Sequence, residues 1–248
     1  MSVHHGDTSV ELGAYTYCFD NGCADGMPPT DPPDVGSPDS VEIAFPLEDW
    51  TFEASFSPAG EQCGRVQTVP LRRTGSGTFL LGPVGYADTY DVTLFGRGGG
   101  DLFTVFRWTT PSDGVLPAPE ARLAVLADHD GEVDSYGVEL AVSNLASTPQ
   151  DASAVITVAA TDGASLEFAA TGLADCQPEG SLYWDGPDAD GLAAAELGAA
   201  PFRYHVELTL DGIAYSADAT WPDDQIAGFE PSVALRFSPA LPGLPARG

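Results

Sequence analysis

Apolar and polar residues alternate most clearly in the segment 202–221. Every second residue of its first half is apolar: Phe202, Tyr204, Val206, Leu208 and Leu210. Successive side chains of a strand point to opposite faces, so this spacing predicts a half-buried antiparallel strand. The pair Asp211-Gly212 then favours a two-residue hairpin turn. The return strand is expected to bury the next alternating set: Ile213, Tyr215, Ala217, Ala219 and Trp221.

Proline and glycine separate further short runs of β-forming residues. The chain has 21 Pro and 28 Gly among its 248 residues, and this punctuation is typical of a sandwich or barrel of short strands. The stretch 27–38 is Pro-rich and is expected to be extended, in a polyproline-like conformation. A second such stretch, 111–119, predicts a domain boundary. One short helix is expected over 192–197, where Gly198 follows as a C-terminal cap.

A weak internal repeat indicates two similar domains. The segment 90–94 (YDVTL) is echoed by 204–208 (YHVEL), and 40–45 (SVEIAF) resembles 137–142 (GVELAV). The copies keep their order along the chain. Tandem copies of one arrangement of strands explain such a repeat.

The Tyr-x-Val pattern at Tyr90 and Tyr204 is typical of the tyrosine corner of immunoglobulin-like sandwiches, in which the ring packs in the core and the hydroxyl bonds to the backbone. The sequence therefore predicts an all-β fold of two tandem immunoglobulin-like β-sandwich domains. The N-terminal sandwich, which includes the Pro-rich segment, is expected over 8–112, and the C-terminal sandwich over 118–238. Residues 239–248 are expected to form a flexible tail.

Charge narrows the choice of partner. The chain has 37 Asp and Glu against 9 Lys and Arg, for a formal net charge of -28, and every basic residue is an arginine. A polyanion repels nucleic acid phosphates and anionic lipid, so no nucleic acid and no anionic membrane surface is expected as a partner. Cationic proteins and neutral glycans remain. Solubility alone also accounts for such a charge.

The cysteines suggest an oxidising compartment. Cys18 and Cys23 flank the turn signal Asn21-Gly22, and a disulfide between them is expected. Cys63 and Cys176 lie in different copies of the repeat, so either they bridge the two domains or both are buried thiols. The spacing of the cysteines and histidines does not fit a zinc site.

The segment 14–26 (AYTYCFDNGCADG) places an aromatic-Cys pair shortly before Cys-Ala-Asp, and a Pro-rich stretch follows. This pattern resembles one found in uncharacterised cell-envelope lipoproteins of GC-rich Gram-positive bacteria, and Trp50 and the segment 56–59 fit the same picture. The resemblance reaches residue 110 at most. It implies no activity, only a bacterial protein that is extracellular or in the cell envelope, with a signal or lipid anchor outside this sequence.

Two acidic loops could bind calcium, which prefers several oxygen ligands. The first loop contributes Asp185, Asp188 and Asp190, and the second contributes Asp128, Asp130 and Asp134. The first does not follow the EF-hand pattern, because its glycine, Gly191, is one position late. In a chain this acidic, such clusters also arise by composition, as ordinary Asp-Gly turns.

Tyr183 and Trp184 lead into the first acidic loop and are the candidate ligand-binding residues. An exposed Tyr-Trp pair beside carboxylates could stack on a sugar or anchor a protein partner, whereas core packing is the alternative. Catalytic patterns are scarce. His4 and His5 are terminal, His129 falls in an expected turn, and no Gly-x-Ser-x-Gly motif occurs. No catalytic residue is assigned, and the sequence leans against an enzyme.

The function expected from the sequence is a non-enzymatic envelope or secreted β-sandwich module that binds or scaffolds a protein or glycan. One alternative is a glycan-active enzyme or its accessory domain, which would show acids converging in a cleft. Another is a structural protein rigidified by calcium, which would melt at a calcium-dependent temperature. The sequence leaves the oligomeric state open.

Overall fold

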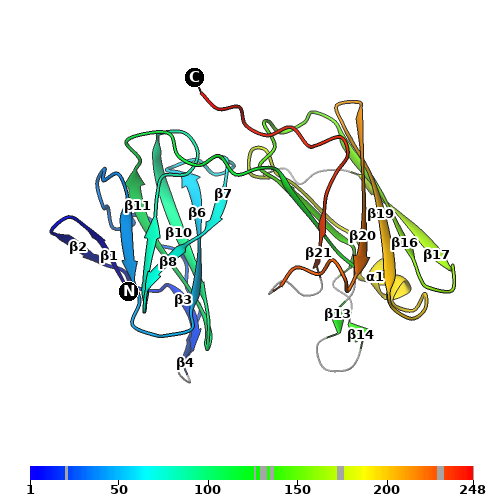
Figure 1. Cartoon of the computed structure of the whole chain (residues 1–248), viewed down its shortest axis with the longest axis horizontal. Coiled ribbons are helices and arrows are strands. Elements are labelled where there is room, and N and C mark those ends of the chain that lie inside the picture. The colour runs from blue at the N-terminus through cyan, green and yellow to red at the C-terminus, as the bar shows by residue number, and fades with distance from the viewer. Residues whose placement is uncertain are drawn as a thin grey trace. The chain divides into compact units, whose positions relative to one another are not determined.

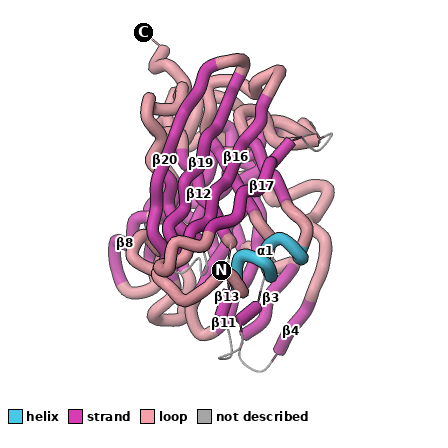
Figure 2. The backbone as a smooth tube through the Cα atoms, turned by 90° about the vertical axis from the view of Figure 1, so that its right-hand side faces the viewer, coloured by secondary structure: helices cyan, strands magenta, loops and turns pink. Residues whose placement is uncertain are grey.

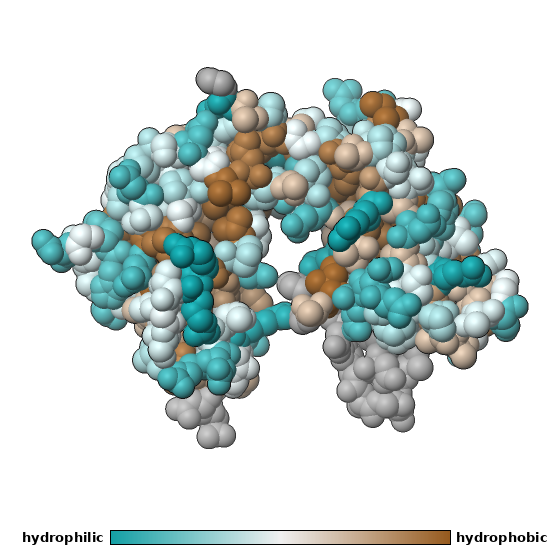
Figure 3. Space-filling model, viewed as in Figure 1, coloured by the Kyte–Doolittle hydropathy of each residue, from teal (hydrophilic) through white to brown (hydrophobic). Residues whose placement is uncertain are grey.

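The computed structural model describes residues 1–19, 22–125, 127–128, 133–134, 137–171, 176–227 and 232–247. The chain divides into two compact units, Met1–Pro117 (unit 1) and Ala118–Gly248 (unit 2), each made of antiparallel β-sheets (Figure 1). Figure 3 shows that both hydrophilic and hydrophobic residues are exposed on this side of the molecule. The predicted all-β fold of tandem immunoglobulin-like sandwiches is confirmed. No helix among the described residues is long and apolar enough to cross a membrane.

Unit 1 consists of two sheets. The five-stranded sheet has the order β2-β1-β5-β9-β8, with bounds Thr8–Glu11, Ser2–His5, Val41–Ala44, Thr78–Leu81 and Arg72–Gly75. The six-stranded sheet has the order β4-β3-β11-β10-β6-β7, with bounds Gly22–Ala24, Thr16–Phe19, Gly100–Thr109, Thr89–Arg97, Thr51–Pro58 and Gln67–Pro70. Residues of both sheets share one buried core, which includes Ile43, Phe56 and Trp108.

Unit 2 also consists of two main sheets. One has the order β18-β15-β12-β21, with bounds Leu182–Asp185, Glu139–Ser143, Glu120–Ala124 and Ser232–Leu235. The other has the order β17-β16-β19-β20, with bounds Ser165–Thr171, Ala152–Ala159, Phe202–Leu210 and Ile213–Trp221 (Figure 2). The remaining elements are the strand pair β13 (Ala127–Asp128) and β14 (Val133–Asp134) and the helix α1 (Asp188–Ala195). The core again joins both main sheets.

The two units use the same strand order. In unit 1, β9-β5-β1 lie in one sheet and β7-β6-β10-β11 in the other; in unit 2, β18-β15-β12 and β17-β16-β19-β20 repeat this arrangement. It is the arrangement of an immunoglobulin-type sandwich, in which consecutive strands are distributed between two sheets. The two parts of the sequence repeat fall on equivalent strands. Segments 90–94 and 204–208 lie on β10 and β19, and segments 40–45 and 137–142 include residues of β5 and β15.

The hairpin β19–β20 follows the alternation in the sequence. The five apolar residues predicted to share one face of β19 are all buried. Asp211 and Gly212 have φ of 47° and 81°, as a turn with two left-handed residues requires. The prediction that Ile213 is buried is wrong, because this side chain is 56% exposed. It directly follows the turn and pairs with Leu210 at the end of the ladder, where the sandwich no longer covers it.

The limits of several elements differ from the sequence expectation. β1 begins at Ser2, ahead of residue 8, where the first sandwich was expected to begin. Within the segment expected to be a flexible tail, 239–248, the carbonyl oxygen of Pro242 accepts a hydrogen bond of 2.8 Å from the N–H of Ala146. Helix α1 begins four residues before the expected position, with Asp188 and Asp190 in its first turn, where acidic side chains interact favourably with the helix dipole.

The two units differ at their tyrosine corners. The Tyr90 hydroxyl donates a hydrogen bond to the carbonyl oxygen of Tyr86 at 2.6 Å, as in a complete corner. Tyr204 occupies the equivalent place on β19 and is 1% exposed, yet its hydroxyl finds no partner. Burial raises the pKa of Tyr204 well above the usual range of a phenol, because no group nearby stabilises the phenolate.

Removing the two hydroxyls should therefore have different effects. Tyr90→Phe deletes a hydrogen bond and leaves a partly buried carbonyl without its partner, which should lower the free energy of unfolding by about 1–2 kcal/mol. Tyr204→Phe removes an unpaired buried hydroxyl, so the free energy of unfolding should stay within about 0.5 kcal/mol of the native value or increase. Urea unfolding of the two variants measures both changes. A larger loss for Tyr204→Phe than for Tyr90→Phe contradicts this comparison.

Candidate functional site

The two residues of the ligand-binding pair expected from the sequence do not lie on the same face of the sheet. Tyr183 and Trp184 are consecutive residues of β18, so they point to opposite faces of the sheet. Tyr183 is 43% exposed, whereas Trp184 is 5% exposed and lies in the core. The expected exposed Tyr-Trp pair is therefore absent, and Trp184 follows the alternative of core packing. Burial, followed by the nearby Glu139 carboxylate, raises the pKa of Tyr183 to about 12.

The first acidic loop does not gather its carboxylates. Asp185 ends β18, while Asp188 and Asp190 begin α1. Helix residues two positions apart do not face each other, so these side chains diverge. Within the described part of the chain, no three His, Cys, Asp or Glu residues are grouped closely enough to hold a metal ion.

The second acidic loop lies outside the described residues. Asp130 is not described, and only the backbone of Asp128 and Asp134 is, as parts of β13 and β14. Calcium binding by these three carboxylates stays a prediction.

All four cysteines take part in disulfides. Cys18 and Cys23 are bonded across the β3–β4 hairpin, where they are directly opposite and their Cα atoms are 4.1 Å apart. Cys63 and Cys176 are also disulfide-bonded, so the alternative of two buried thiols is wrong. Disulfides persist in oxidising environments, which supports such a setting for this protein.

An aromatic cluster that the sequence reasoning missed lies on the outer face of the six-stranded sheet. Phe95 of β10 is paired with Phe103 of β11, and their alternating neighbours, Leu94 and Leu102, point into the core. Tyr15, just before β3, bonds through its N–H to the carbonyl oxygen of Phe103 at 3.0 Å. Tyr15, Phe95 and Phe103 are all partly exposed, and we call them the aromatic strip.

The rings of the aromatic strip contact one another. Phe95 and Phe103 stack with centroids 4.5 Å apart and an angle of 22° between their planes. The Tyr15 ring lies 6.2 Å from Phe103, and the guanidinium carbon of Arg97 is 4.9 Å from the Phe95 ring centre. Aromatic and cation–π contacts at these distances are favourable. The strip is therefore an ordered surface.

One apolar side chain on the same outer face of the sheet is buried. Val105 is 5% exposed but is not among the residues of the unit 1 core. Its cross-strand partner is Thr93, whose side chain is hydrogen-bonded to Tyr15. Burial raises the pKa of Tyr15, since desolvation outweighs the opposing effect of that hydrogen bond. The residues around Val105 thus orient the Tyr15 ring.

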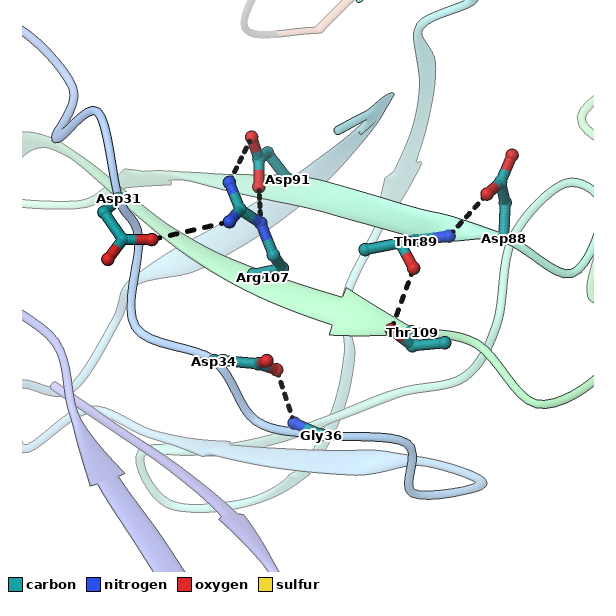
Figure 4. Close-up of polar contacts among 8 residues, drawn as sticks. All are labelled: Asp31, Asp34, Gly36, Asp88, Thr89, Asp91, Arg107 and Thr109. Carbon is teal, nitrogen blue, oxygen red and sulfur yellow. Dashed lines mark hydrogen bonds and ion pairs between the residues drawn. The ribbon is translucent and has the colours of Figure 1, made fainter. Parts of the chain in front are cut away.

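Charged residues continue the outer face beyond the aromatic strip (Figure 4). The Arg107 Nε and Nη2 atoms bond to the two carboxylate oxygens of Asp91 at 2.8 and 3.3 Å, and Nη1 lies 3.5 Å from Asp31. The hydrogen bond with Asp91 is the main reason that the pKa of Arg107 is raised. This two-point contact fixes the orientation of the guanidinium relative to Asp91.

The Pro-rich segment lies along the edge of β11. The Arg107 N–H bonds to the carbonyl oxygen of Pro33 at 2.8 Å, and the Val35 N–H bonds to the carbonyl oxygen of Arg107 at 3.0 Å. The indole N–H of Trp108 bonds to the carbonyl oxygen of Pro38 at 3.1 Å. β3 pairs only with residues 100–103 of β11. The Pro-rich segment therefore bonds to backbone groups of the remaining half of β11 that would otherwise be unpaired, and it protects the sheet that carries the strip.

The alternation of β10 and β11 contains a signal for the aromatic strip. Among the side chains of these strands that face away from the core, those of Thr89, Asp91 and Arg107 are polar, whereas those of Phe95 and Phe103 are apolar. Large apolar side chains on the otherwise polar, outward face of an amphipathic strand suggest a binding surface. The contribution of Tyr15 has no such local signal, because it comes from pairing with a segment far along the chain.

Comparison with known proteins adds little to this picture. No family model and no curated protein matches the chain. A crystal structure of the FN1–FN3 domains of chicken CNTN1 is similar over 80% of this chain and 69% of that chain, with 16% sequence identity and a TM-score of 0.23. The fold assignment rests on the strand order of the two units.

The pairing of Cys63 can be read from a tryptic digest of the unreduced protein. Cleavage after Arg65, Arg122 and Arg203 places Cys63 in peptide 1–65 and Cys176 in peptide 123–203. If the two cysteines bridge the domains, which is one of the two alternatives that the sequence leaves open, mass spectrometry should find these two peptides linked before reduction and separate after it. Mass spectrometry that finds the two peptides unlinked before reduction would rule out the bridge.

Proposed function

We propose that this protein is a non-enzymatic extracellular or cell-envelope β-sandwich module that binds another protein through the aromatic strip of unit 1. The observation that carries the proposal is the placement of Tyr15, Phe95 and Phe103 on an outward sheet face, partly exposed and ordered by Arg97. Aromatic and arginine side chains are enriched in protein interfaces and dominate their binding energy.

The ring geometry favours a protein over a glycan. A sugar binds by stacking its flat face on a free aromatic face, whereas Phe95 already contacts Phe103 and the Arg97 guanidinium. What the strip offers is a compact apolar surface with ring edges, which suits the packed side chains of a protein partner. Tyr183, the exposed aromatic of unit 2, has no such neighbours among the aromatic contacts of the described residues.

The surroundings of the strip favour a partner with a basic rim. Glu53 is the cross-strand neighbour of Phe95 on β6, and Asp101 is the neighbour of Arg97 on β11. Arg107 is neutralised by Asp91 and Asp31, and the remaining carboxylates, Glu53 and Asp101, give this face a net negative charge. Together with a net charge of -28, this arrangement should speed association with cationic proteins and make it sensitive to salt.

The test compares capture of secreted and cell-surface proteins by three immobilised forms of the intact chain. The native form and Tyr183→Ser should retain the same bound protein, because Tyr183 lies outside the strip. Phe95→Ser combined with Phe103→Ser should lose it by at least about tenfold in affinity, as expected for central interface residues. Far-UV circular dichroism confirms that each variant keeps its sheets.

A glycan array probed with the same three forms tests the alternative. Binding of a neutral glycan by the native form that survives in the strip variant would contradict the proposal. Loss of protein capture in Tyr183→Ser, with capture retained in the strip variant, would move the site to unit 2 and to the residue indicated by the sequence.

A further inference from the structure

The outer edge of β17 is the one long strand edge in the described structure that no other segment covers. β17 is an outermost strand of its sheet and pairs only with β16 (Figure 2). It spans seven residues with a continuous register, no proline and a single charged residue, Glu167. A strand edge of this kind presents a row of unpaired backbone groups that favours pairing with a further strand.

The other edges of unit 1 are short or blocked. β2, β7 and β8 have four residues each and β4 has three. β7 ends in Pro70, and β8 carries two arginines and an irregular register between Arg73 and Gly75. β4 is tied to β3 by the disulfide of Cys18 and Cys23. Short length, proline, charge and irregularity are the usual protections of a sheet edge.

The other edges of unit 2 are capped by specific contacts. On β18, the Gln177 side chain bonds to both the N–H and the carbonyl oxygen of Tyr183, at 2.8 and 2.9 Å. On β20, Ser216 and Ser238 exchange two backbone hydrogen bonds of 2.9 and 2.8 Å. On β21, the Ile226 N–H bonds to the carbonyl oxygen of Ser232 at 2.8 Å. These caps leave β17 as the exception.

The residues of β17 are complementary to themselves. In an antiparallel pair with a two-fold axis at Phe168, Glu167 of one copy lies opposite Ala169 of the other, so the two glutamates are not opposed. On the other face, Leu166 lies opposite Ala170 and the two Phe168 rings meet. Phe168 and Ala170 already pack against the core of unit 2, so their face would form a continuous apolar surface. Such cross-strand pairs are favourable.

We propose that two copies of this chain associate through antiparallel pairing of their β17 strands, which joins the β17-β16-β19-β20 sheets into one sheet across the dimer. A two-fold contact of this kind is closed, so it stops at two copies. Each copy carries a net charge of -28, which opposes association at low ionic strength. Salt screens this repulsion, and the dimer should therefore be favoured as salt increases.

Sedimentation velocity of the intact native chain tests the proposal over a range of concentrations, from roughly 0.1 M to 1 M salt. The native chain should shift from monomer to dimer, and more so at high salt. Ala169→Glu places two like-charge pairs in the two-fold contact and should weaken the dimer about tenfold; Ala169→Lys places Lys opposite Glu167 and should strengthen it. The Ala169 side chain is exposed, so both variants should fold.

Ala214→Glu and Ala214→Lys are the matched controls. Ala214 is exposed on β20, at the opposite edge of the same sheet, and the substitutions change the net charge equally. The controls should shift the dimer far less than the Ala169 variants. Equal effects at both positions, or a native chain that stays monomeric at high salt, would overturn the proposal.

Hydrogen exchange gives a readout that needs no variant. Every second amide of β17 points away from β16, and this set should become protected as the concentration of the native chain rises, because these amides gain strand partners. A dimer whose formation leaves these amides unchanged would use another surface and would contradict the pairing.

Discussion

A strand that lies on a core can direct only every second side chain into it, and the rest of this structure depends on that constraint. In β10 and β11, one set of side chains, among them Tyr90, Leu94 and Trp108, closes the core of unit 1. The other set faces away from that core. That outward set carries Phe95 and Phe103, and with Tyr15 they form the surface that we assign to binding. One hairpin thus supplies both stability and a candidate site.

The two units share one arrangement of strands but differ in the segments that surround it. Both have the same order of strands, but unit 1 adds the β3–β4 hairpin and the Pro-rich segment along β11, whereas no described residue of unit 2 pairs with the outer edge of β17. The tyrosine corner is complete at Tyr90 and lacks its hydrogen bond at Tyr204. Regions outside the common strands therefore determine which surfaces each unit has available for partners.

The sequence allows prediction where the signal is local. Alternation over 202–210 is sufficient to predict β19, and the repeat is sufficient to predict a second sandwich of the same kind. The position of Tyr183 and Trp184 before an acidic loop does not distinguish an exposed pair from core packing. Neighbours in a strand face opposite ways, so the structure buries Trp184 and exposes Tyr183. The aromatic strip depends on a contact between Tyr15 and Phe103, residues far apart in the chain, and no local pattern reveals which segments pair. The uncovered edge of β17 likewise appears only once all strands are placed.

The central claim is that the aromatic strip serves binding and is not required for folding. Urea unfolding of Phe95→Ala combined with Phe103→Ala, beside Phe106→Ala in the core, tests it most directly. Phe106 is 0% exposed, so its truncation should lower the free energy of unfolding by about 3–5 kcal/mol. The double strip variant should lose less than about 2 kcal/mol, because both rings are partly exposed. A loss as large as that of Phe106→Ala would make the strip a second core and contradict the account.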